Sequence, residues 1–397
     1  MEQLSRADLC TLGRETMLAA HLQDRASMPA LFGRHPMDEA FELAIDEWMT
    51  ASPVYTRRMQ RLLGFEGDDV ETIFKGLQLD VGFPHQFLDV GYRLDDARSG
   101  EFWLVHCGAL ADVSPMGEPF VRSMCHTVED PTFDATAVAT NARARVRPVH
   151  RPPGVPTGGP DCHWTVAIDD AAEPTQPHPW LEAMAGCVLA GLPNDRVEAY
   201  AGPFDPHFEL ESLPRPALQV VVREFAIQGH LLARAILGAI DRRHGAAEAV
   251  DVGRALFTGM AWIAAERLAR ALGSTDVATV LPLTYLLLPD DYVGLAVDTD
   301  GGTTTITLDG AALGLTEGDP YSLPGLLLEH GDDIVASLVH GVDPTAVVEP
   351  TEVPGALRAW TVTAGTDPAP QPGEVELVRF STGVAVTLRR RAPRPAD

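Results

Sequence analysis

The sequence predicts an α+β protein built from two tandem copies of one unit, a helical hairpin followed by an antiparallel sheet, with the copies packed as a pseudo-dimer. Three observations support this. The order of helical and β-type periodicity occurs twice along the 397 residues, and each pass includes a proline-rich loop that a strand follows. Short identities also recur: Asp130-Pro131-Thr132 matches Asp343-Pro344-Thr345, and Cys107-Gly108-Ala109 resembles Asp309-Gly310-Ala311.

The first unit is predicted to span residues 1–170. Apolar residues with helical spacing indicate helices over 4–22, 37–49 and 54–63. After Asp80 the period changes to that of strands, with a hairpin over 87–94 and 102–107. A helix is expected to start at Asp130-Pro131-Thr132, because proline is tolerated in a first turn. Further strands are predicted over 142–149 and 163–168, on either side of the proline-rich loop 152–160.

A proline-rich linker, residues 171–216, is expected to carry one helix over 180–192. The second unit, 217–397, follows the order of the first. Its helices are predicted over 221–240, 252–272 and 334–339, and its strands over 292–297, 303–308, 357–362, 375–380 and 384–388.

Charge and composition limit the partners of the chain. The formal net charge of −26 would repel nucleic acids and anionic membranes, so neither is expected as a partner. No secretory signal opens the chain, and the most apolar stretch, 277–288, is too short to span a bilayer. We therefore expect a cytoplasmic protein whose five cysteines are thiols. A single lysine among many arginines is typical of a GC-rich genome, as in an actinobacterium.

Three cysteine–histidine neighbours lie in the first unit: His106-Cys107, Cys125-His126 and Cys162-His163. Two acids, Glu129 and Asp130, follow the second pair. Thiolate and imidazole are preferred ligands of zinc, and carboxylates can complete such a site. Adjacent residues of a strand face opposite sides, so each strand pair can supply only one ligand to a given site. Buried cysteine is also a common apolar filler. We expect that role for Cys10 and Cys187, consider both roles for Cys107 and Cys162, and favour function for Cys125.

The second copy serves as an internal control. When the Asp-Pro-Thr sequences are aligned, Cys125 faces Leu338 and His126 faces Val339. The thiols are therefore absent from the second copy, which we expect to be degenerate, with any chemistry confined to the first unit.

The cysteine pattern resembles that of the L-2-amino-thiazoline-4-carboxylic acid hydrolase family. The similar positions are Cys107, then Cys125 with Glu129-Asp130, then Cys162 ahead of Trp164, all within about 91–168. His126 and His163 are not part of the family's pattern. The resemblance implies hydrolytic opening of a small ring that contains sulfur or nitrogen.

Two mechanisms are compatible with these residues. In the first, zinc held by Cys107, Cys125 and His126 or His163 lowers the pKa of a bound water, with Glu129 or Asp130 as general base. In the second, Cys125 is the nucleophile and His106 or His163 is its base. The alternative to a hydrolase is a non-catalytic sensor of a small molecule or metal. A homodimer is compatible with both the hydrolase and the sensor.

Overall fold

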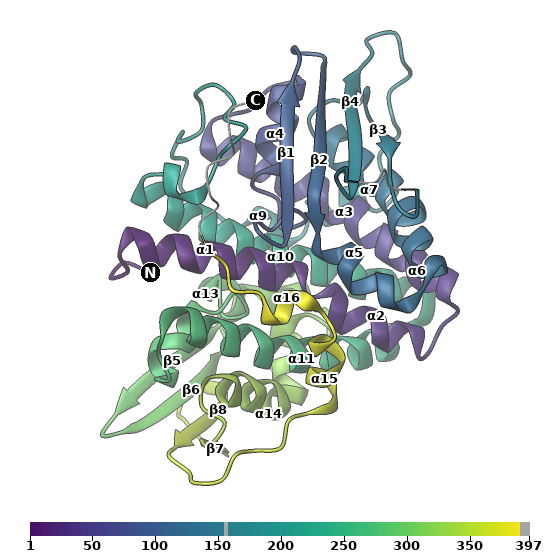
Figure 1. The fold of residues 1–397 in the computed structure, drawn as a ribbon. Helices are drawn as coiled ribbons and strands as arrows, with labels where there is room; N and C mark the ends of the chain where they lie inside the picture. The colour runs from purple at the N-terminus through teal and green to yellow at the C-terminus, as the bar shows by residue number, and fades with distance from the viewer. Residues whose placement is uncertain (155–157, 390–397) are drawn as a thin grey trace.

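The computed structural model describes residues 1–154 and 158–389 and places two antiparallel sheets at opposite ends of a layer of helices (Figure 1). Each half of the chain supplies one four-stranded sheet, and the helices of both halves pack together between the sheets. The predicted α+β class with one unit in each half is thus confirmed. Part of the predicted proline-rich loop, 155–157, and the tail 390–397 lie outside the described residues.

The first sheet has the order β1-β2-β4-β3, with all neighbours antiparallel. Its strands are β1 (Leu88–Leu94), β2 (Ser99–Cys107), β3 (Ala144–His150) and β4 (Cys162–Ile168). Burial alternates along β2 and β4, so one face of the sheet is in the core. On that face Phe102 stacks near Trp164, and Phe133 of α7 (Glu129–Val138) contacts both rings. The helix that carries Glu129 is thereby fixed against the sheet.

The second sheet repeats this topology as β5-β6-β8-β7. Its strands are β5 (Leu295–Asp300), β6 (Thr303–Asp309), β7 (Val347–Thr351) and β8 (Ala356–Thr363). The ladders also correspond residue by residue. Trp164 pairs with Phe102 and Pro148, and Trp360 pairs with Ile306 and Pro350. A buried tryptophan opposite a proline therefore marks the same position in both sheets.

This ladder correspondence corrects the register that the sequence indicated. Asp130-Pro131-Thr132 lies in the first turn of α7, whereas Asp343 follows the last residue of α14 (Leu323–Val342). The two short identities are thus at opposite ends of their helices and are not equivalent. In the ladders Cys162 pairs with Leu104 and Arg358 pairs with Leu308, so Arg358 corresponds to Cys162.

Four long helices and one shorter helix form the layer between the sheets. The long helices are α1 (Arg6–His21), α3 (Met37–Leu63), α10 (Arg215–His244) and α11 (Ala246–Leu272), and the shorter one is α2 (Asp24–Phe32). Helix α10 packs against α1 and α3, and α11 packs against α14. The sequence predicted a break near Pro53, but α3 continues through it. Proline removes only one backbone donor, and the buried residues on both sides, such as Ala51 and Tyr55, hold the helix in the core.

Two buried, bidentate ion pairs join the halves. Arg58 of α3 binds Glu224 of α10 at 2.7 and 2.9 Å. Arg267 of α11 binds Glu15 of α1 at 2.9 and 3.1 Å, and it also donates to the carbonyl oxygen of Gly383. The planar guanidinium suits two parallel hydrogen bonds to a carboxylate. These pairs fix the relative position of the helices that surround the site.

The C-terminal segment differs from the prediction. Residues 375–380 and 384–388 were expected to be strands, but the chain forms α15 (Gly373–Arg379) and α16 (Thr382–Ala385) instead. Val375 and Val378 are three residues apart and both buried, which is the spacing of a helix that packs on one face. The segment returns to the first half, where α15 packs against α2 and α16 against α5 (Gly108–Val113).

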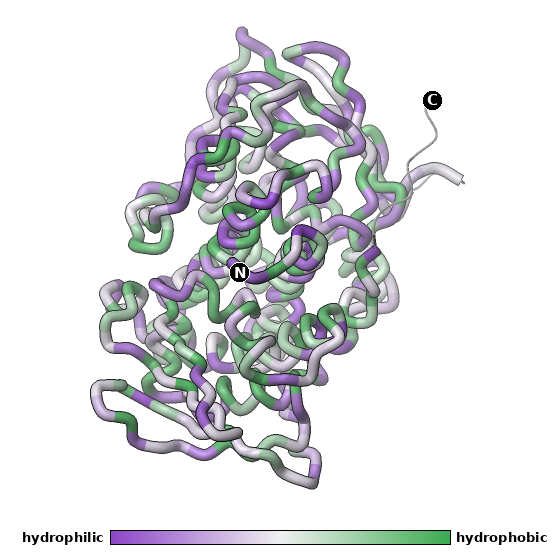
Figure 2. The backbone as a smooth tube through the Cα atoms, turned by 90° about the vertical axis from the view of Figure 1, so that its left-hand side faces the viewer, coloured by the Kyte–Doolittle hydropathy of each residue, from purple (hydrophilic) through white to green (hydrophobic). Residues whose placement is uncertain are grey.

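The remaining elements are short. They are α4 (Val70–Leu77), η1 (Ser114–Met116), α6 (Glu118–Arg122), η2 (Ser123–Val128), α8 (Leu181–Ala185), α9 (Val188–Gly191), η3 (Leu210–Ser212), α12 (Val277–Val280), η4 (Leu281–Leu283), α13 (Asp290–Val293) and η5 (Leu313–Glu317). The predicted linker helix is therefore two helices, α8 and α9. Figure 2 shows hydrophobic and hydrophilic stretches interspersed along the chain. None of the described helices is both long and apolar enough to cross a membrane.

Candidate functional site

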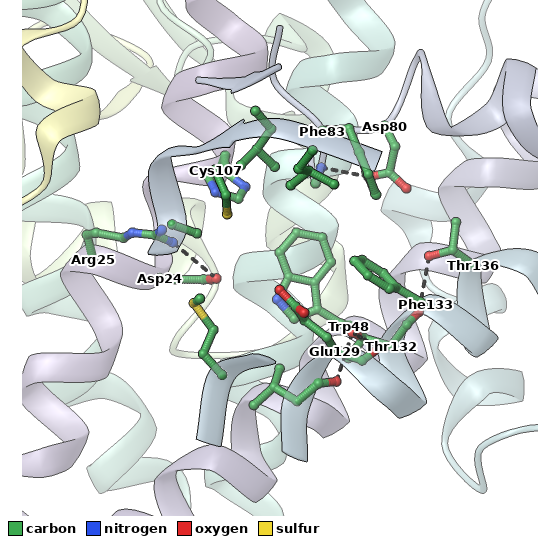
Figure 3. A pocket seen from close by; sticks show the side chains of 17 residues that line it. Asp24, Arg25, Trp48, Asp80, Phe83, Cys107, Glu129, Thr132, Phe133 and Thr136 are labelled. Atoms are coloured by element: carbon green, nitrogen blue, oxygen red, sulfur yellow. Dashed lines mark hydrogen bonds and ion pairs between the residues drawn. The ribbon is translucent and has the colours of Figure 1, made fainter. Parts of the chain in front are cut away.

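Two adjoining cavities lie beside α2 and α3: one is lined by the first unit alone, and the other also by the C-terminal segment. The smaller one, here called the chamber, has a volume of about 120 Å³, and the larger one, the vestibule, about 470 Å³. Both are lined by Asp24, Arg25, Trp48, Met124 and Val128, so they meet at these side chains. The remaining chamber residues are His21, Asp80, Gly82, Phe83, Leu88, Leu104, Cys107, Ala109, Glu129, Thr132, Phe133 and Thr136 (Figure 3).

Helix α7 supplies one wall of the chamber. Glu129, Thr132, Phe133 and Thr136 are spaced so that they share one helix face, and all four line the cavity. The helix continues from η2, a π-helical turn, and the Thr132 hydroxyl donates to the carbonyl oxygen of Val128 at 2.9 Å. π-Helical turns occur frequently at functional sites. Here the turn precedes the residue that places a carboxyl in the chamber.

Cys107 enters from the opposite side, at the end of β2. The chain turns directly from β2 into α5 at Gly108, where a Cβ atom would lie 2.2 Å from the Phe87 ring, so only glycine fits. The Cys107 sulfur then caps α5, accepting a hydrogen bond from the backbone N–H of Leu110 at 3.3 Å. Figure 3 shows the Cys107 sulfur and the Glu129 carboxyl pointing into the same space, with Trp48 beside Glu129.

Glu129 is protonated at neutral pH. Burial raises the pKa of its carboxyl to about 8, with Arg151 opposing the shift and Asp130 adding to it. Its Oε2 atom has no hydrogen-bond partner among the residues that the structure describes. A buried carboxyl with an oxygen that makes no hydrogen bond can donate a proton to a ligand in the chamber or accept one from it.

Asp80 is the ionised counterpart of Glu129. Burial raises its pKa only to about 6, because hydrogen bonds from the Gly82 N–H at 2.7 Å and the Tyr55 hydroxyl at 2.8 Å favour the charged form. Both donors bind Oδ1, which leaves Oδ2 to accept a proton. Two carboxyls in one chamber thus carry opposite protonation states near pH 7, a pattern found where one group acts as an acid and the other as a base.

Three further titratable groups surround the chamber. Burial raises the pKa of Glu47 well above its usual range, and the nearby Asp24 raises it further. The pKa of Asp24 is raised by burial despite the adjacent Arg25. Burial lowers the pKa of His21 well below its usual value, so this imidazole is neutral. The Arg25 guanidinium donates a hydrogen bond to the Asp112 carboxylate at 3.2 Å. This ion pair reduces the effect of the Arg25 charge on the groups in the chamber.

The cysteines that the sequence singled out are all buried. Burial is the main cause of a raised pKa at Cys107, Cys125 and Cys162, and Glu129 is the second cause at each; for Cys107 the value is about 12. The fold therefore brings these three thiols and Glu129 into one region. All three are thiols rather than thiolates at neutral pH, which reduces their nucleophilicity.

The predicted histidines and Asp130 have other partners. His126 Nε2 lies 2.7 Å from the carbonyl oxygen of Pro152, and His163 Nε2 lies 2.8 Å from the Glu101 carboxylate. His163 is adjacent to Trp164 in β4 and so faces away from the core side of the sheet. Asp130 forms an ion pair with Arg151. Within the described ranges, the only compact group of three potential metal ligands contains none of Cys107, Cys125, His126 and His163.

Several chamber residues, His21, Asp24, Trp48 and Asp80, were missed from the sequence, as was Glu47, which interacts with Asp24. One signal was present. Glu47 lies on the same face of α3 as Leu43, Ala44 and Ala51, which are all buried. A charged residue on a buried helix face is unusual unless it is paired or functional.

The vestibule is apolar and completed by the second half of the chain. Phe32 contacts Phe41 and Phe120 edge to face, at 5.5 Å between ring centroids in each pair. Leu377 and Phe380, in and just after α15, form another part of the lining. An apolar molecule could therefore rest between α2, α3 and the C-terminal segment while reaching the chamber.

The chain was compared with protein families, curated proteins and solved structures. None of them matches it.

Proposed function

We propose that the first unit is a small-molecule hydrolase, which holds the polar part of its substrate in the chamber and the apolar part in the vestibule. The observation that carries this is the pair of chamber carboxyls, Glu129 and Asp80, whose pKa values are about 8 and about 6. The substrate class is a small ring that contains nitrogen or sulfur, in line with the resemblance of Cys107, Cys125 and Cys162 to the thiazoline hydrolase pattern.

The dimensions of the site fit such a ligand. A chamber of about 120 Å³ has room for a small polar ring or several water molecules. The vestibule, at about 470 Å³, lies within the usual range of small-molecule sites, about 300–1,000 Å³. Trp48, on the boundary between the cavities, offers a flat surface for the ring.

The carboxyl pair supports a direct hydrolysis. A water molecule attacks the ring carbon next to nitrogen and gives its proton to the ionised Asp80, while protonated Glu129 gives a proton to the departing ring nitrogen. The carbon–nitrogen bond breaks and one water is added. Exchange of a proton through solvent restores both carboxyls. This route needs no thiolate, which agrees with the raised pKa values of the three buried cysteines.

The test is to incubate the full chain with thiazolines, imidazolines and lactams that carry apolar substituents, and to follow addition of one water by mass spectrometry. We expect turnover by the native protein and its loss in Glu129→Gln and in Asp80→Asn, with thermal melts that show both variants folded. The proposal fails if turnover of a panel member persists in both variants.

A non-catalytic ligand-binding protein is the second candidate, favoured by the vestibule, which is larger and more apolar than the chamber. In that case panel members would raise the melting temperature without any addition of water. Phe380→Ala should then weaken binding, because its ring lines the vestibule, and Glu118→Gln, on an exposed turn of α6, serves as a matched control. If no panel member binds or reacts, both candidates are wrong for this class of ligand.

A further inference from the structure

A second cluster of metal-ligating side chains lies where two helix junctions meet. His35 precedes α3 and Glu39 is in its first turn, while His244 ends α10 and Glu248 is in the first turn of α11. His244 Nε2 lies 3.0 Å from the Glu39 carboxylate, and His35 Nε2 lies 3.3 Å from that of Glu248. The two imidazole rings stack at 4.1 Å between centroids.

The geometry points to a binding site for a divalent transition metal ion, zinc in preference, on His35, Glu39 and His244. One ligand atom from each of these residues lies within 4.8 Å of the other two. Imidazole nitrogen and carboxylate oxygen are ligands that zinc takes readily. Glu248, or water, would complete a four-coordinate site. This inference is independent of the hydrolase proposal and involves none of the chamber residues.

Ligand atoms around zinc are roughly 3.4 Å apart, given metal–ligand distances of about 2.0–2.2 Å. Contraction from at most 4.8 Å requires each side chain to move by about an ångström or less. Three of the four residues lie in the first or last turn of a helix, and His35 lies two residues before α3. Gly245, with φ of +92°, makes the sharp turn that brings His244 and Glu248 together.

The surroundings also suit a bound cation. Arg34 donates to the Glu248 carboxylate at 3.2 Å and so orients it, in the way that outer partners orient metal ligands. Asp251 lies 3.6 Å from the same guanidinium. Without metal, the histidine–carboxylate contacts would form an ordinary ion-pair cluster. The feature that favours a metal site is that both imidazoles and both carboxylates converge from two separate junctions.

A metal here would join the two halves of the chain. Glu39 and His35 belong to the junction between α2 and α3, whose helices line the vestibule, and His244 belongs to the junction of α10 and α11. Binding should therefore stabilise the native chain by mass action.

The test uses full-length protein, stripped with a chelator and dialysed. Titration with Zn²⁺ in a calorimeter is expected to show one equivalent bound, and Co²⁺ should give visible d–d absorption. His35→Ala and His244→Ala should each weaken Zn²⁺ binding at least tenfold, whereas His207→Ala, an exposed histidine elsewhere, should not. Circular dichroism of each metal-free variant shows that it is folded.

A double variant, Cys107→Ser with Cys125→Ser, distinguishes this site from the thiol region. Zn²⁺ binding that survives this change but is lost in His244→Ala supports the proposal. Binding that is lost with the thiols and unaffected by His35→Ala and His244→Ala overturns it, as does the absence of stoichiometric binding by the native chain. If His244→Ala is unfolded, His244→Gln with the Co²⁺ spectrum as readout takes its place.

Discussion

The Asp112 carboxylate in the first half accepts two hydrogen bonds from Thr382 in the second, 2.7 Å from the backbone N–H and 2.8 Å from the hydroxyl. Asp112 also accepts from Ser381 at 2.6 Å and from Arg25. This one buried side chain therefore connects the C-terminal segment to the arginine at the boundary of chamber and vestibule. The segment that was predicted to be two strands of the second unit instead completes the site of the first.

Asp112→Ala should detach the C-terminal segment. The change leaves the buried Arg25 with only its longer contact to Asp24, at 3.8 Å, and breaking a buried charge pair costs about 3–5 kcal/mol. We expect a loss of that order in the free energy of unfolding, measured by urea denaturation, and faster hydrogen exchange over 373–385. Asp95→Ala, in an exposed hairpin turn, should change the stability by less than about 1 kcal/mol. Unchanged exchange in Asp112→Ala would contradict the anchoring role.

Glu129 should make the stability depend on pH. Its pKa is raised from 4.5 to about 8 on folding, so the folded chain keeps a proton that the unfolded chain releases. The resulting stabilisation is complete below pH 4.5 and is lost as the pH rises to about 8. Asp80 acts in the same direction but only up to about pH 6. Between pH 6 and 8 the melting temperature of the native chain should therefore fall more steeply than that of Glu129→Gln.

The control for this comparison is Glu118→Gln, because Glu118 is largely exposed. Its melting temperature should follow that of the native chain across the whole range. Parallel curves for the native chain and Glu129→Gln would mean that Glu129 is not held protonated by the fold.

If the hydrolase proposal holds, kcat/KM should follow a bell-shaped pH profile with limbs near pH 6 and pH 8. The lower limb reports ionisation of Asp80, and the upper limb reports loss of the proton from Glu129. Any residual activity of Asp80→Asn should lack the lower limb, and that of Glu129→Gln should lack the upper one. A profile that keeps both limbs in these variants would assign them to other groups.

The buried cysteines should react slowly. Burial raises the pKa of the thiols of Cys107, Cys125 and Cys162, so iodoacetamide at pH 7.5 should label them far more slowly in the native chain than in urea. Peptide mass spectrometry measures the labelling site by site. Under the acid–base route, Cys125→Ala should retain turnover and lose about 1–2 kcal/mol of stability through a small cavity. Abolished turnover in a folded Cys125→Ala protein would instead support the nucleophilic route.

The local pattern of apolar residues was sufficient to predict most of the helices and strands. Apolar spacing predicted α1 and the hairpin of β1 and β2 to within three residues, because each buries one face and its period depends only on neighbours along the chain. It also predicted α10 and α11, although both helices begin six residues earlier than expected. The pattern gave the wrong elements for residues 375–388. The valines of this segment are compatible with a strand or a helix, and the packing of α15 against α11 and α2 favours the helix. The pattern also failed for the register of the two copies, since a three-residue identity says nothing about which end of a helix it occupies.

For the site, the sequence by itself determined that the first half holds a cysteine- and acid-containing region, with Cys107 and Glu129 among its residues. Only the tertiary structure decided that Asp80 and Asp24 face the same chamber, that the predicted histidines bind elsewhere, and that the C-terminal segment closes the vestibule. The physical reason is that protonation state depends on burial and on groups distant in sequence. Glutamate and aspartate have similar carboxyl groups, and the different environments of Glu129 and Asp80 give these two side chains different pKa values.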